Sequence, residues 1–176
     1  MKKLIPSNTK REDCVMTPQH LADALVEHFR PHGKILEPCE GTGNFVKAIS
    51  NKVIVKHSVQ TCEITEGKDF FDFRDKVDWI ITNPPYSKIR KFMKHSMELS
   101  DNIVFLVTIN HLWLKARIRD IEESGFGIRE MVYFDTPKEF PKSGFQFGAF
   151  YLQKGYKGSI LFSKLNSKGS LNSSQP

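Results

Sequence analysis

The sequence predicts a single α/β domain whose mostly parallel sheet carries helices on both faces. Short apolar runs alternate with amphipathic stretches at helical spacing, which is the pattern of parallel strands joined by crossover helices. Two of the runs, 77–83 and 102–109, are almost continuously apolar, as expected of strands buried on both faces. The 176 residues have room for one such domain. We place it at residues 14–163, between an N-terminal arm (1–13) and a disordered tail (164–176).

The individual elements are predicted from apolar spacing and from the residues that begin and end helices. Thr17 and Pro18 are suited to begin the first helix, and Pro31 and Gly33 to end it. The expected helices span 17–29, 44–50, 88–100 and 111–125. The expected strands span 34–38, 53–64, 77–83, 102–109, 128–134 and 147–154, the last two as a C-terminal antiparallel pair.

Composition narrows the class of protein. The net charge of +6 and the pI of about 9.2 favour a polyanionic partner, nucleic acid first. Cys14, Cys39 and Cys62 are too widely spaced for a zinc pair or a disulfide framework, so we expect a reduced, cytoplasmic protein. We also expect no metal, no signal peptide and no membrane span, because neither the histidine spacing nor any apolar run is typical of them.

A glycine turn follows the strand expected at 34–38, in the stretch LEPCEGTGNF. Gly41 and Gly43 allow the backbone to approach a ligand closely, and Glu37 ends the strand beside them. The spacing is neither that of a dinucleotide fingerprint nor that of a P-loop, so a ligand whose binding does not rely on a diphosphate fits better. The alternative is a tight strand-to-helix turn without a ligand.

Two further sites are candidates for binding a nucleoside. Glu63 ends the second strand, about twenty residues past the turn, where a carboxylate can accept hydrogen bonds from two ribose hydroxyls. Asp69 could accept a hydrogen bond from an adenine amino group, and Phe70 could cover its ring. The alternatives are a solvated loop glutamate, and a capping aspartate beside a core phenylalanine.

The apolar run 77–83 ends on an unusual corner, Asn83-Pro84-Pro85-Tyr86. Pro84 forces Asn83 into an extended conformation, and both prolines lack an N–H donor. The Asn83 side-chain oxygen and the Pro84 carbonyl can therefore converge on an amine with two hydrogens, such as the exocyclic amine of adenine. Tyr86 offers a flat face on which such a ring could stack. The alternative is a Pro-Pro turn around an asparagine that is satisfied within the protein.

In these motifs and their order the sequence resembles the S-adenosylmethionine-dependent N6-adenine DNA methyltransferases, in particular compact phage-type members. The matching stretches are TPQHLADAL, LEPCEGTGNF, DFF, TNPPY and FPKSGFQFGAFYL, and the resemblance spans Met16 to Lys154. It implies a Rossmann-like class I methyltransferase domain that uses S-adenosylmethionine. The cofactor-binding residues that it implies, together with the candidates above, are Thr17, Glu37, Pro38, Gly41, Gly43, Phe45, Glu63, Asp69, Phe70 and Asn83.

The resemblance also implies a mechanism and a substrate. Asn83, Pro84, Pro85 and Tyr86 would hold the target amine for direct methyl transfer without a covalent enzyme intermediate. Cys39 is rejected as the nucleophile that cytosine C5 methylation needs, because it lies inside the glycine turn. Phe145 or Phe147 would flank a base that is flipped out of DNA or presented by a single strand. The cations expected to contact phosphates are Lys88, Arg90, Lys91, Lys94, Lys115, Arg117 and Arg119. For each of them, a solvated helix face is the alternative.

Two departures from the family pattern lead to further expectations. The span from Glu63 to Asp69 is too short for a helix and a full strand, so we expect the sheet to be truncated after the second strand. No target-recognition domain follows Lys154, so a separate specificity subunit is a candidate partner, as in restriction-modification. Methylation of RNA or of a protein glutamine, and a non-catalytic subunit that binds cofactor or nucleic acid, remain alternatives.

Overall fold

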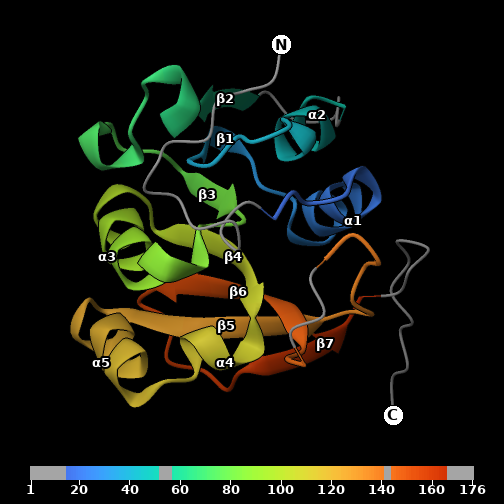
Figure 1. Cartoon of the computed structure of the whole chain (residues 1–176). Coiled ribbons are helices and arrows are strands. Elements are labelled where there is room, and N and C mark those ends of the chain that lie inside the picture. The colour runs from blue at the N-terminus through green and yellow to red at the C-terminus, as the bar shows by residue number, and fades with distance from the viewer. Residues whose placement is uncertain (1–14, 52–56, 141–143, 166–176) are drawn as a thin grey trace.

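A computed structural model describes residues 15–51, 57–140 and 144–165. In this part of the chain seven strands form one sheet in the order β2-β1-β3-β4-β6-β5-β7 (Figure 1). The strands are β1 (Gly33–Glu37), β2 (His57–Thr61), β3 (Trp79–Thr82), β4 (Asn102–Thr108), β5 (Phe126–Tyr133), β6 (Phe147–Lys154) and β7 (Leu161–Lys164). The helices are α1 (Gln19–Phe29), α2 (Asn44–Ser50), α3 (Ile89–Leu99), α4 (Ile109–Leu112) and α5 (Lys115–Glu123). Three short 3₁₀ turns are η2 (Ile64–Glu66), η3 (Phe70–Asp72) and η4 (Tyr86–Lys88).

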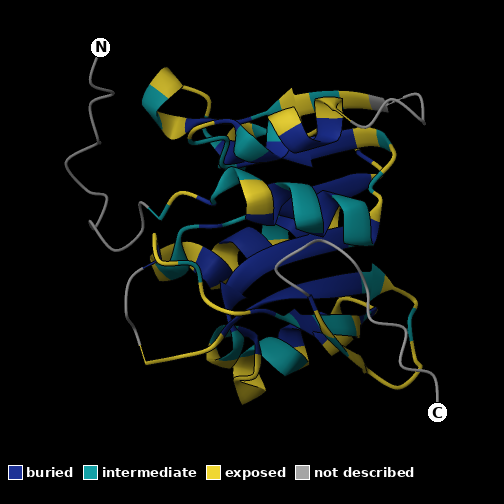
Figure 2. Ribbon diagram, turned by 90° about the vertical axis from the view of Figure 1, so that its right-hand side faces the viewer, coloured by how far each residue is buried: buried dark blue, intermediate teal, exposed yellow. Residues whose placement is uncertain are grey.

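Helices cover both faces of the sheet, as predicted. Helices α1 and α2 lie on one face, and α3 and α5 on the other (Figure 1). Successive side chains of each strand enter different cores: Val104 of β4 packs on the α1 side, and Phe105 packs on the α3 side. The central strands are consequently buried throughout, whereas exposed residues gather on the outer faces of the helices and in the loops (Figure 2).

The parallel half of the sheet is truncated, and this prediction is confirmed. Strand β2 pairs with β1 alone among the described strands, and the chain from β2 to β3 contains the 3₁₀ turns η2 and η3 instead of a helix and a strand. Because β2 and β3 lie on opposite sides of β1, the carboxyl ends of β1 and β3 are neighbours at a topological switch point. The glycine turn and the Asn-Pro-Pro-Tyr corner, which follow these two strands, are therefore brought together.

The C-terminal half contains the predicted antiparallel pair and one strand that was not expected. Strand β6 is antiparallel to both β4 and β5, while β7 pairs parallel with β5 at the edge. Glu130 of β5 ties this edge to the first helix, because its Oε1 accepts from Ser163 Oγ (2.7 Å) and lies 2.8 Å from His28 Nε2. Leu165 after β7 is buried, and the rest of the expected tail, like the expected arm and residues 53–56 of the second expected strand, lies outside the described residues.

The helix expected at 111–125 is wrong as a single element. The structure divides it into α4 and α5, with a break at Trp113 and Leu114, where Leu114 has an extended backbone (ψ 135°). The Arg117 guanidinium donates to the His111 carbonyl and so satisfies a backbone group at the end of α4. The break leaves the side chains of Trp113 and Leu114 at the surface.

Candidate active site at the carboxyl ends of β1 and β3

Three segments that are distant in sequence meet beside the sheet. They enclose a small cavity of about 30 Å³. Its walls come from the stretch before α1, from the glycine turn and from the end of β3: Val15, Met16, Thr17, Cys39, Glu40, Gly41, Thr42, Asn44, Phe45 and Asn83. Thr17, Gly41, Phe45 and Asn83 were predicted to act together, and the fold places them around one point. Pro38 is buried next to this cavity.

Two glycines of the glycine turn have positive φ angles, which glycine adopts more readily than other residues. Gly41 and Gly43 have φ angles of +55° and +74°, and Gly43 is the N-cap of α2. A Cβ atom on Gly41 would lie 2.8 Å from the Met16 sulfur, so the thioether of Met16 lies against the turn. The cavity beneath it is far smaller than a nucleoside cofactor, so Met16 must move aside before a ligand of that size can enter.

Glu63 is directed at the glycine turn and is not a solvated loop residue. Its side chain is buried, its Oε2 accepts from the Gly41 N–H (2.9 Å), and its Oε1 accepts from the N–H and the hydroxyl of Thr65 (3.0 and 2.6 Å). Each carboxylate oxygen can accept more than one hydrogen bond. Since three donors within the protein already occupy this carboxylate, its role toward the hydroxyls of a ribose stays a prediction.

Glu37 is a buried acid at the end of β1. It is 1% exposed, and its Oε1 accepts from the Cys39 N–H (2.9 Å). Burial raises the pKa of Glu37 to about 8, and the nearby carboxylates of Glu40 and Glu63 add to this effect. The same burial raises the pKa of the Cys39 thiol well above its usual value, so Cys39 is a poor nucleophile at neutral pH.

The orientation of the Asn83 side chain is fixed from its nitrogen end. Nδ2 donates to the Val15 carbonyl (2.8 Å) and to Thr17 Oγ1 (3.3 Å). Because a carbonyl oxygen can only accept, the amide nitrogen must face Val15, and Oδ1 points the opposite way. Within the described residues, no group donates to Asn83 Oδ1 or to the Pro84 carbonyl.

Tyr86 lies between two aromatic neighbours. Its ring centroid is 5.4 Å from that of His111 on α4 and 6.2 Å from that of Phe147 at the start of β6. Phe147 is 1% exposed and packs edge-on against Phe140, whereas Phe145 is 57% exposed. Of the two predicted base-flanking residues, Phe145 is the one with an accessible face. Pro85, half-buried, precedes the turn η4.

Several other predicted site residues have contacts that match the structural alternative. Asp69 caps η3 by accepting from the Phe71 N–H (2.9 Å), and Phe70 is 2% exposed and stacked on Phe92. Their roles toward adenine stay predictions.

Of the cations expected to contact phosphates, some pair with an acidic side chain and others do not. Arg90 forms two hydrogen bonds with Asp120 of α5 (2.5 and 3.0 Å), and Lys94 lies 3.2 Å from the same carboxylate. These contacts, led by the Arg90 hydrogen bond, lower the pKa of Asp120 to about 2. Lys88 and Lys91 are exposed and have no ion pair among the described residues.

Sequence reasoning missed two features of the site. The first is the anchoring of Asn83 by the Val15 carbonyl and the Thr17 hydroxyl, and the second is the contact between His111 and Tyr86. A backbone carbonyl has no sequence signature. His111 lies in a stretch that reads only as helix, so no pattern identified it.

The described residues contain no helix long and apolar enough to cross a membrane. No group of three or more His, Cys, Asp or Glu side chains in the same part of the chain could hold a metal ion.

Comparison with known proteins identifies the fold. No family model and no curated protein matches the sequence. Among solved structures, a protein described as a class I S-adenosylmethionine-dependent methyltransferase from Listeria monocytogenes matches with a TM-score of 0.66 at 15% identity, over 94% of this chain and 69% of that chain. The type I restriction-modification methyltransferase subunit from Streptococcus thermophilus matches with a TM-score of 0.67 at 12% identity, over 88% and 48%. The M protein of the type I restriction enzyme EcoKI matches with a TM-score of 0.60 at 13% identity, over 86% and 48%.

These similarities are structural. The chain spans about half the length of the two type I subunits that it matches. In this chain the matched region contains a seven-stranded sheet that is parallel except around β6. The chain therefore has the Rossmann-like fold of the class I S-adenosylmethionine-dependent methyltransferases.

Proposed function

We propose that this protein transfers a methyl group from S-adenosylmethionine to the exocyclic N6 amine of adenine in DNA. The observation that carries the proposal is the orientation of Asn83. Its Nδ2 is held by Val15 and Thr17, which leaves Oδ1 on the opposite side of the amide, and Asn83 lines the same cavity as the glycine turn. A preorganised acceptor at a topological switch point suits a reaction in which a nitrogen becomes positively charged.

The residues around the glycine turn fit the cofactor chemically. Glu63 would accept from the ribose hydroxyls, and Gly41, Thr17 and Phe45 would surround the amino-acid end once Met16 has moved. When bound, the cofactor supplies an electrophilic methyl group on a sulfonium. The carboxylates of Glu40 and Glu63 lie close enough to Glu37 to help raise its pKa, and their negative charge favours a ligand that carries a positive charge.

The chain's own part in the reaction is to bind and orient the amine. Asn83 Oδ1 and the Pro84 carbonyl would accept the two N–H bonds, which directs the nitrogen lone pair away from them and stabilises the charge that develops on nitrogen. Tyr86 would stack on the base from the position in which His111 and Phe147 hold it. No nucleophilic side chain is required, in agreement with the raised pKa of Cys39.

The choice of DNA rests on charge and on the structural neighbours. The net charge of +6 and the exposed Lys88 and Lys91 beside the corner favour a nucleic acid over a protein glutamine. Two of the similar structures are methyltransferase subunits of type I restriction-modification systems. By analogy with these subunits, we propose that target selection uses a separate specificity subunit or the sequence context of an accessible strand.

The test is methyl transfer with a labelled cofactor. Tritium from the methyl group should enter DNA, and digestion should recover it as N6-methyladenine. RNA and glutamine-containing peptides at the same concentration serve as comparisons, and label in either instead of DNA would assign the alternative substrate. Calorimetry without substrate tests the cofactor: heat on adding S-adenosylmethionine but no transfer to any substrate would indicate a non-catalytic subunit.

A further inference from the structure

The break between α4 and α5 creates an apolar groove that the sequence motifs did not predict. Trp113 and Leu114 are each 53% exposed, and Phe145 faces them at 57% exposure. Together with Ile109, Asn110 and Gln146 they line a hollow of about 700 Å³. Exposed aromatic side chains that share one hollow are unusual on a surface that no ligand covers.

The groove adjoins the catalytic corner on two elements. Tyr86 contacts His111 and Phe147, at 5.4 and 6.2 Å between ring centroids. Trp113 lies two residues beyond His111 along the α4 break, and Phe145 lies two residues before Phe147 at the start of β6. Trp113 and Phe145 are therefore each two residues in sequence from a ring that contacts Tyr86.

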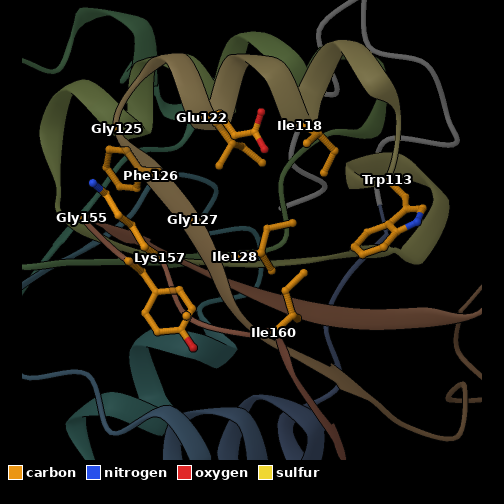
Figure 3. A pocket seen from close by; sticks show the side chains of 13 residues that line it. Trp113, Ile118, Glu122, Gly125, Phe126, Gly127, Ile128, Gly155, Lys157 and Ile160 are labelled. Atoms are coloured by element: carbon orange, nitrogen blue, oxygen red, sulfur yellow. The ribbon is translucent and has the colours of Figure 1, made fainter.

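Trp113 separates this hollow from a second one. The second hollow, of about 580 Å³, lies between α5 and β5 and is lined by four isoleucines, four glycines, three aromatic side chains, Glu122 and Lys157. Figure 3 shows the Trp113 ring at its right-hand end, near Ile118, with Ile160 below and Lys157 at the opposite end. The indole therefore lines both hollows, and its exposure leaves surface on which a flat ring can stack.

The surroundings favour a nucleic acid as the occupant. Lys115 directly follows Leu114, is exposed, and has no ion pair among the described residues. Lys88 and Lys91 provide further exposed charge just after Tyr86, and the chain carries a net charge of +6. Cations beside aromatic rings are the usual means of binding unpaired strands, because phosphates meet the cations while bases stack on the rings.

We propose that Trp113 stacks on an unpaired nucleobase next to the target adenine, so that the substrate is a single strand or an unpaired segment. In a duplex both faces of each base are covered by its neighbours, and Trp113 would have nothing to stack on. The inference rests on the proposed function for the identity of the target base. Strand binding itself needs neither cofactor nor turnover, so the two can fail separately.

The chain contains its own reporter for this contact. It has two tryptophans, and Trp79 is buried against Tyr151, so a ligand in the groove should change the fluorescence of Trp113 alone. We expect quenching by a short adenine-containing single-stranded DNA, without cofactor, and little quenching by the matched duplex. Anisotropy of the labelled strand should show about a tenfold loss of affinity in Trp113→Ala. Trp113→Phe, which keeps a ring, should retain most of the affinity.

Leu161→Ala is the matched control, because Leu161 is 58% exposed on β7 and lines neither hollow. It should bind the strand as the unmodified protein does. Equal affinity of Trp113→Ala and the unmodified protein, or equal quenching by strand and duplex, would overturn the proposal. So would sedimentation showing a dimer that Trp113→Ala dissociates, because the groove would then bind a second copy. Strand binding that depends on Trp113 in a protein without methyl transfer would leave this inference standing and reject the proposed function.

Discussion

The candidate site beside the parallel strands and the groove beside β6 differ in how far their side chains are exposed and hydrogen-bonded. Beside the parallel strands β1 and β3, polar groups are enclosed and bonded: Glu63 accepts from Gly41 and Thr65, and Asn83 donates to Val15. Beside β6, where the sheet becomes antiparallel, apolar groups are exposed, with Trp113 and Phe145 open to solvent. The polar side chains are thus oriented by hydrogen bonds within the protein, whereas the exposed rings would be covered only by a ligand.

This difference predicts that the enclosed region contributes to methyl transfer and the exposed region to strand binding. A group that stabilises charge in a reaction is most effective when its orientation is set in advance. A surface that binds a strand gains its free energy when the ligand covers exposed rings, so it can be left open. Changes in the enclosed half should therefore affect turnover or stability, and changes in the exposed half should affect binding.

Asn83→Ala is the strongest test of this division. It removes the oriented oxygen, so we expect methyl transfer to fall by about a thousandfold, measured as tritium incorporation into DNA. Cofactor affinity, measured by calorimetry, should change little. Asn51→Ala is the control, because Asn51 is exposed after α2 and lines neither the cavity nor the groove, and it should keep the turnover rate. Normal turnover in Asn83→Ala would remove the basis for placing the chemistry in the enclosed half.

Glu37→Gln tests how the burial of this carboxyl group affects the pH dependence of stability. Because the pKa of Glu37 is raised to about 8 in the folded state, the folded state binds the proton more tightly than the unfolded chain. Stability from this group is full below pH 4.5 and is lost as pH rises from there through 8, by about 5 kcal/mol in total. Glu37→Gln should flatten the decline in unfolding free energy, measured with denaturant between pH 5 and 9. An unchanged decline would mean that Glu37 ionises freely.

The sequence predicts the enclosed half far better than the exposed half, for physical reasons. Strand burial and the glycine and proline corners are local patterns with few alternatives, and the short link after β2 already implied a truncated sheet. Whether Trp113 lies in a helix or at a break depends on Arg117 reaching the His111 carbonyl, a contact that spacing does not encode. Arg90 likewise looks like a solvent-facing cation until the fold places Asp120 beside it.

Arg90→Met tests whether this cation belongs to the fold or to the substrate surface. It leaves the 3%-exposed Asp120 with Lys94 as its remaining ion pair among those described, so we expect the melting temperature to fall by about 5 °C. Lys91→Met, on the same helix, should leave the melting temperature unchanged. It should instead weaken strand binding and reduce its salt dependence by about one counterion. The reverse pattern would place Arg90 on the substrate surface.

Thr17→Val is expected to have the smallest effect and gives the finest test of how Asn83 is held. The hydrogen bond from Asn83 Nδ2 to the Thr17 hydroxyl is long, at 3.3 Å, while the Val15 carbonyl remains at 2.8 Å. We therefore expect kcat to fall about threefold with cofactor affinity unchanged, and Thr17→Ser to restore it. Thr42→Val, on the rim of the same cavity, controls for the loss of a hydroxyl. If cofactor affinity falls and kcat does not, the Thr17 hydroxyl forms a hydrogen bond with the cofactor instead, and Val15 alone orients the amide.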